Sequence, residues 1–175
     1  MKRNTLTRLG VLSAAMGMVL GSGAWAAESA SHTVNVTVSE INEITVAQDA
    51  VALTIDGDSE TIGLNRVETN TSSWGVFTNR PTTDQMKVSA KIDLPLATGL
   101  TLKVAAEAPS NGTSADEVAL GTSDVAVVTG IFAVDQLAGN PLNLTYKLYA
   151  TKDAAPAIVD AVTVTYTIAD NGGGT

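Results

Sequence analysis

The 175-residue chain has no cysteine, a single histidine and few aromatic residues. Without cysteine the protein has neither disulfides nor a thiol nucleophile, so the packing of its core must hold the fold. One histidine, His32, is too few for a multi-histidine metal site, and its place near the N-terminus argues against a serine–histidine–aspartate triad. Because no cofactor motif occurs either, we expect a protein that is not an enzyme and binds no cofactor.

Basic residues are also scarce. The chain has 10 Lys and Arg against 18 Asp and Glu, and three of the basic residues are Lys2, Arg3 and Arg8. The rest of the chain therefore carries seven basic residues against 18 acidic ones, a net charge of −11. A charge of this sign opposes binding to nucleic acid and to anionic lipid.

Residues 1–26 have the three parts of a secretory signal peptide. The basic segment Met1–Arg8 precedes the apolar run Leu9–Leu20, and the small residues Ala24 and Ala26 follow it. We expect cleavage after Ala26. The apolar run is shorter than the roughly 20 residues that a membrane span needs, so no stable span should remain. The predicted location is extracellular, at the cell surface, after bacterial-type export through a periplasm if the host has one.

Apolar and polar residues alternate with period two along most of the remaining chain, which predicts strands. These runs are Val34–Val38, Val51–Ile55, Trp74–Phe77, Met86–Ile92, Leu100–Val104, Val125–Val128, Leu142–Leu148 and Val162–Ile168. Strands with one apolar face must stack, so the sequence predicts an all-β protein, an antiparallel β-sandwich (Ig-like or pilin-like) of about eight or nine strands. Leu144, Tyr146, Val164 and Tyr166 are predicted to face inward.

The chain is predicted to have four parts along its length. These are the signal peptide 1–26, an N-terminal strand segment 27–46, the sandwich domain 47–169 and a flexible, glycine-rich tail 170–175. Turn-forming residues separate the strands, as at Asn79–Pro81. The polar segment Glu68–Ser73 is predicted to be a long loop, and Ser114–Leu120 a connection with one helical turn.

Two acidic clusters are candidate sites. Asp56, Asp58 and Glu60 alternate around a glycine, as cation ligands do at the start of a calcium loop, but the spacing is incomplete because Val67 stands where the twelfth-position glutamate would be. We expect an acidic turn there and keep these three residues only as weak metal candidates. The second cluster is Asp116, Glu117 and Asp124, for which solvated carboxylates are expected rather than a glycosidase pair.

Both ends of the sequence resemble a known family. His32–Val46, an alternating strand just after the predicted cleavage site, resembles the N-terminal extension of donor-strand pilins. The likeness is to the colonisation-factor class of secreted pilins, where a similar valine and threonine strand leads into an Asp-Gly turn, here Asp56–Gly57. The C-terminal Ala161–Ile168 is similar to the closing strand of many bacterial surface β-sandwich subunits.

In those families the extension of one subunit completes the sheet of the next. The resemblance therefore implies a structural subunit of an extracellular filament or pilus, with Val34, Val36 and Val38 on the donated strand. The partners would be further copies of the chain and an export or assembly chaperone. The sequence leaves open whether this strand pairs within its own domain or with another copy.

The sequence also leaves a second class of function open. A monomeric secreted β-sandwich could bind carbohydrate or divalent cations at the cell surface. By alternation Tyr149 points to the strand face opposite that of Tyr146, so its ring is the candidate for stacking on a sugar.

Overall fold

The structure, a computed structural model, describes residues 33–47, 49–137, 139–156 and 161–172. The predicted signal peptide, residues 27–32 of the predicted N-terminal segment and residues 173–175 of the predicted tail lie outside this part. The chain divides into two units, Met1–Thr37 and Val38–Thr175. Of the first unit only residues 33–37 are described, and they form neither strand nor helix. All the strands described below belong to the second unit.

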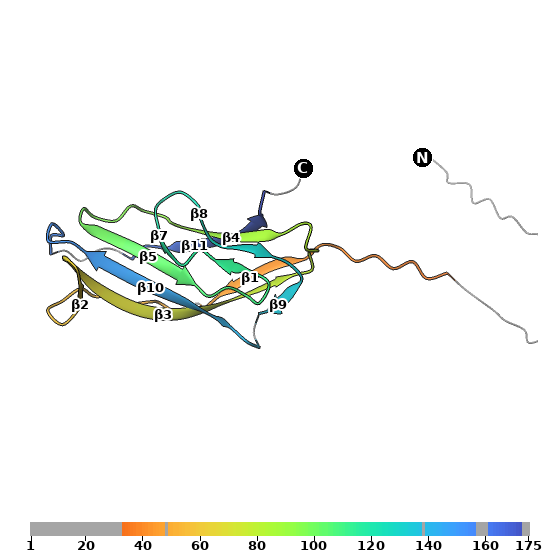
Figure 1. Cartoon of the computed structure of the whole chain (residues 1–175), viewed down its shortest axis with the longest axis horizontal. Coiled ribbons are helices and arrows are strands. Elements are labelled where there is room, and N and C mark those ends of the chain that lie inside the picture. Colours follow the sequence, from red (N-terminus) through yellow and green to blue (C-terminus); the bar gives the residue numbers. More distant parts are fainter. Residues whose placement is uncertain (1–32, 48, 138, 157–160, 173–175) are drawn as a thin grey trace, which may run out of the picture. The chain divides into compact units, whose positions relative to one another are not determined.

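Regular structure in the described residues is entirely β, as the sequence predicts, and the strands form two antiparallel sheets (Figure 1). The four-stranded sheet has the order β11-β4-β8-β6. The seven-stranded sheet has the order β1-β3-β10-β5-β7, and β2 and β9 each pair with β3. The strands of the seven-stranded sheet are β1 (Asn42–Val46), β2 (Glu60–Ile62), β3 (Asn65–Thr78), β5 (Leu100–Ala106), β7 (Glu117–Ala119), β9 (Val134–Gln136) and β10 (Leu142–Ala150). Those of the four-stranded sheet are β4 (Met86–Ile92), β6 (Thr113–Ser114), β8 (Val125–Ile131) and β11 (Val164–Asp170).

The core lies between the apolar faces of the two sheets. Along β4 every second residue is buried, because successive side chains of a strand point to opposite faces. Ile92 and Ile131 of one sheet and Leu144 of the other are among the largest fully buried side chains. Tyr146 is buried beside Leu144, which confirms the inward face predicted for β10. The arrangement is that of a β-sandwich, held without disulfides.

Three local predictions were wrong. Glu68–Ser73 is not a loop but the middle of the 14-residue β3, paired residue by residue with β10. Ser114–Leu120 forms no helical turn and contributes instead to β6 and β7. Val51–Ile55 alternates in burial but does not form a strand. The contact from β3 is a side-chain hydrogen bond, in which Asn70 donates to the Ala52 carbonyl at 2.8 Å.

The N-terminal strand segment predicted as 27–46 divides within the described residues. Asn42–Val46 forms β1 and pairs with Trp74–Thr78 of β3. Residues 33–41 have no assigned strand. No helix among the described residues is both long and apolar enough to span a membrane.

Candidate functional site

A groove lies between the edges of the two sheets. β1 is the last strand of the seven-stranded sheet, β11 is the last strand of the four-stranded sheet, and the two strands approach each other. The groove has a volume of about 790 Å³ and opens along this side of the sandwich. We call it the edge groove. Most of the residues in its walls are apolar, among them Ile44, Val46, Val51, Leu53, Val162 and Val164.

The edge groove exists because the core is incompletely covered on this side. Ile44 and Val46 of β1, and Val164 and Tyr166 of β11, face the core in the same alternating pattern as the buried residues of β4. They remain only half-buried, since each lies on a terminal strand with no further strand beyond it in the described part of the chain. The inward direction predicted for Val164 and Tyr166 is confirmed. A strip of apolar surface is therefore left in contact with solvent.

Two tyrosines cross the interior of the groove. The hydroxyl of Tyr146 on β10 and that of Tyr166 on β11 lie 2.7 Å apart and share a hydrogen bond between the two sheets. Burial raises the pKa of both hydroxyls above the ordinary tyrosine value. Both rings are therefore neutral at physiological pH. The one charged residue along the lining in the described region is Asp49, so an occupant of this groove should be apolar and uncharged.

The predicted donor residues are present as an apolar row in solvent. Val34, Val36 and Val38 are 67%, 80% and 79% exposed, so most of the surface of each residue is accessible. The row lies in an uncharged stretch, residues 33–39. Contiguous exposed apolar patches can mark interaction surfaces, whereas single exposed apolar residues are common.

The first acidic cluster forms a hydrogen-bonded turn. Oδ1 of Asp56 accepts hydrogen bonds from the backbone N–H groups of Asp58 and Ser59 at 2.9 and 3.1 Å. Asp56 thus acts as the turn residue, in the manner of an Asx turn. Across the described ranges no three acidic or histidine side chains lie close enough to hold a metal ion together, and Asp58 and Glu60 are exposed.

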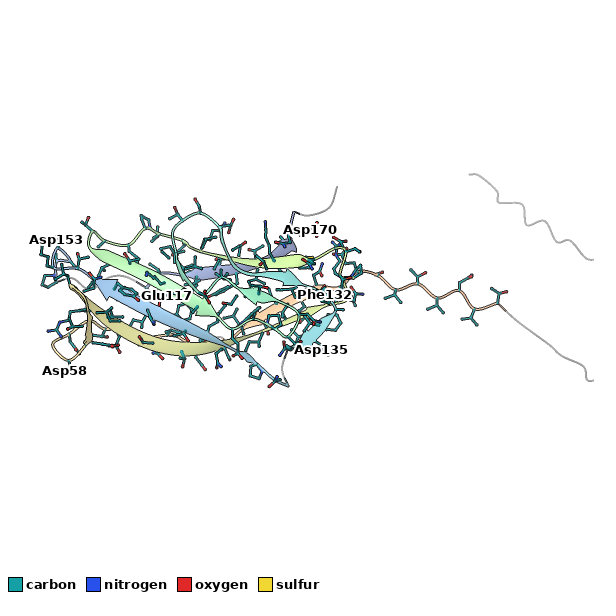
Figure 2. The ribbon with its side chains drawn as sticks, in the orientation of Figure 1. Asp58, Glu117, Phe132, Asp135, Asp153 and Asp170 are labelled. Carbon is teal, nitrogen blue, oxygen red and sulfur yellow. The ribbon has the colours of Figure 1, made fainter. Side chains whose placement is uncertain are left out.

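Of the second acidic cluster, Glu117 belongs to an ion-pair network on the outer face of the seven-stranded sheet. Glu117 of β7 contacts Lys147 Nζ at 2.8 Å and Lys103 Nζ at 3.0 Å, and accepts a hydrogen bond from the Tyr149 hydroxyl at 2.8 Å. The bond from Lys147 is the main reason that the pKa of Glu117 is lowered to about 2. A general acid needs a raised pKa, so Glu117 is unsuited to that role. Figure 2 shows Glu117 and Asp58 in separate parts of the domain.

Tyr149, whose ring is the candidate for stacking on a sugar, makes contacts within the same network. Lys103 Nζ lies 4.5 Å from the centre of this ring, and the hydroxyl is bound to Glu117. Asp124, the third member of the predicted cluster, lies apart and pairs with Lys91 at 3.4 Å. These contacts favour a structural role for the network.

Sequence reasoning missed the edge groove and two residues at its end, Asn79 and Arg80. These two were predicted only as part of a turn, but their side chains contact the segment that leads into β1. The asparagine and arginine in a turn give no sequence signal for such a role, because their partners lie about 40 residues away along the chain.

Comparisons of the chain with protein-family models, with curated proteins and with solved structures found no match. The β-sandwich class rests on the sheets and core described above. The likeness to donor-strand pilins remains a prediction from the two ends of the sequence.

Proposed function

We propose that this chain is a structural subunit of an extracellular filament. In this proposal the strand segment from Ala27 to about Ser39 of one subunit enters the edge groove of the next. The observation that carries the proposal is the match between an open apolar groove at the sheet edges and an exposed valine row of period two in the same chain.

The match is chemical as well as geometric. Side chains at alternate positions of a strand point to one face, so Val34, Val36 and Val38 can enter the groove together while Asn35 and Thr37 face away. Residues 33–39 bring no charge into the apolar site. Burying three valines would contribute roughly 5 to 9 kcal/mol before the entropic costs of association.

The backbone of the acceptor supports strand addition. β11 pairs with β4 along one edge and is the terminal strand of its sheet in the described region. An exposed strand edge is a template for pairing with another chain, and main-chain hydrogen bonds would add affinity that does not depend on side-chain identity. The valines would then fix the register, because a shift by one residue turns them away from the groove.

A donor segment and an edge groove on each chain would lead directly to a polymer. The two surfaces differ, so the contact is head-to-tail, and such contacts build open filaments unless the rotation between subunits closes a ring. The alternative of a monomeric module that binds carbohydrate or cations has less support, because Tyr149 is bound to Glu117 and Asp56 is bound to the backbone of its own turn.

A pair of charge substitutions tests the proposal. Val36→Asp would place a carboxylate in the apolar groove, so filaments should be lost while the subunit remains folded and exported. The matched control is Asn35→Asp, which adds the same charge one residue away on the opposite face and should retain filaments. Electron microscopy and sedimentation measure the polymer, and circular dichroism measures the fold.

Equal filament yield from Val36→Asp and the unmodified chain would contradict the proposal. So would an unmodified protein that stays monomeric under conditions that preserve its fold.

A further inference from the structure

In a subunit that has both a donor segment and a groove, the segment can insert into the groove of its own chain. A segment tethered to its own groove by a few residues has an effective concentration in the millimolar range, far above that of other copies in dilute solution. Insertion within one chain would therefore dominate, and no polymer would form. A filament subunit of this kind needs a feature that disfavours insertion into its own groove.

Insertion within the same chain would require a sharp reversal. For Val34, Val36 and Val38 to lie beside their own β1, the chain must turn back between Val38 and Asn42, where β1 begins. The three residues available for this turn are 39–41. Their conformation thus decides whether the reversal can form.

Asn79 holds these residues in line with β1. Its Oδ1 accepts a hydrogen bond from the Ile41 N–H at 2.9 Å, and its Nδ2 donates to the Ser39 carbonyl at 2.8 Å. The backbone N–H of Asn79 also donates to the Ile41 carbonyl at 3.3 Å. These bonds continue the β1–β3 ladder beyond Thr78, the last residue of β3, so that residues 39–41 stay extended.

Arg80 fixes the residue between these bonds. Its Nη2 lies 2.8 Å from Glu40 Oε1 and 2.9 Å from Asp170 Oδ1, and its Nη1 contacts Asp84. Asp170 is the last residue of β11 (Figure 2). Arg80 therefore ties the start of β1 to the end of β11 at one end of the edge groove. The Arg80 side chain is only 17% exposed, whereas its partners Glu40 and Asp170 are 47% and 67% exposed.

We propose that Asn79 and Arg80 form a latch that holds residues 39–41 extended and so bars the valine row from its own groove, leaving it for a second copy. This inference rests on the proposed function. Asn79 and Arg80 act as positioning residues, since in this arrangement neither contacts the donated strand. The latch favours polymer over self-occupied monomer.

Cross-linking can distinguish insertion within a chain from insertion between chains. Since the chain has no cysteine, Val36→Cys and Val164→Cys would introduce a unique pair, one on the donor and one in the groove. A bismaleimide reagent then joins the pair within one chain or between two chains. A denaturing gel separates the products, and mass spectrometry of the linked peptides confirms them.

Adding Asn79→Ala and Glu40→Ala to the two-cysteine variant breaks the latch. Arg80 then keeps its contacts to Asp84 and Asp170. Loss of these bonds should lower the ratio of interchain to intrachain products by roughly fivefold or more, and filament yield should fall with it. The control Lys91→Ala removes an ion pair elsewhere, with Asp124 at 3.4 Å, and should leave the ratio unchanged. A change in stability alone would not move this ratio.

If the double variant loses its fold, Asn79→Ala alone, at an exposed side chain, gives the same comparison. An unchanged ratio in a folded latch variant, with interchain products still dominant, would overturn the latch and leave the proposed function standing. Absence of both products, or dominance of intrachain products before the latch is broken, would overturn both.

Discussion

The two long edges of the sandwich differ in how the chain covers the core there. On one side the chain closes the structure itself: it leaves β6 in the four-stranded sheet, turns at Asp116 with a positive φ of 58°, and continues as β7 in the seven-stranded sheet. Leu120 then donates its N–H to Leu102 at 2.8 Å, and Gly121 accepts from Ile92 of the other sheet at 2.9 Å. On the opposite side β1 and β11 end their sheets with the edge groove between them.

The difference shows in how the edge residues are buried. Leu120, on the closed side, is only 7% exposed, whereas Val164 and Tyr166 on the open side are half-buried. A strand that switches sheets covers the core through its own covalent continuity. On the open side no described strand switches sheets, and Val51 and Leu53 pack against the core without a strand ladder. One sandwich thus combines a side closed by its own chain with a side that carries the edge groove.

Truncating one apolar residue on each side should give the largest difference in stability. Leu120→Ala should lower the free energy of unfolding by about 2 to 4 kcal/mol, because a buried side chain is replaced by a cavity. Val164→Ala should cost the isolated subunit about 1 kcal/mol, because fewer atoms are lost and they are already partly in solvent. Denaturant titration of the monomers measures both.

Equal losses of unfolding free energy for Leu120→Ala and Val164→Ala would show that the core is covered as well at the β1 and β11 edge as at the β6 and β7 edge. An unchanged midpoint for Val164→Ala would show that this residue does not face the core.

A smaller effect concerns the charge network that covers the closed side. The pKa of Glu117 is lowered to about 2 in the folded protein, mainly by the bond from Lys147. A lowered folded-state pKa stabilises the protein above the unfolded value of about 4.5. That contribution is lost as the pH falls from about 4.5 to about 2. Because the pair is partly solvated, we expect less than about 1 kcal/mol.

Glu117→Gln should remove this part of the pH dependence and leave filament assembly unchanged. Denaturation midpoints of both proteins between pH 2 and pH 7 measure it. If the two proteins lose stability in parallel over that range, Glu117 makes no such contribution.

Alternation was a reliable guide wherever a strand has one apolar face. It predicted β4, β5, β10 and β11 and the inward side of the last two. It failed at Glu68–Ser73, where serine, threonine and asparagine conceal the strand because the β10 ladder, not an apolar face, holds this segment in place. It also failed at Val51–Ile55, where side chains pack without a backbone ladder.

Of the candidate site, the valine row could be predicted from the sequence, but the groove could not. The valine row is visible in the sequence because it needs only local periodicity. The groove is not, since its walls come from segments more than 100 residues apart, such as Leu53 and Val162. The latch depends in the same way on contacts between Asn79 or Arg80 and residues 39–41, about 40 positions earlier.

In the proposed filament, the N-terminal segment of another copy fills the edge groove. Electron cryomicroscopy of filaments assembled from the full chain tests it directly. We expect density for an extended strand between β1 and β11, with Val34, Val36 and Val38 directed into the groove and the chain traced to the neighbouring subunit. An empty groove in such filaments, or a strand traced to the same subunit, would contradict the account.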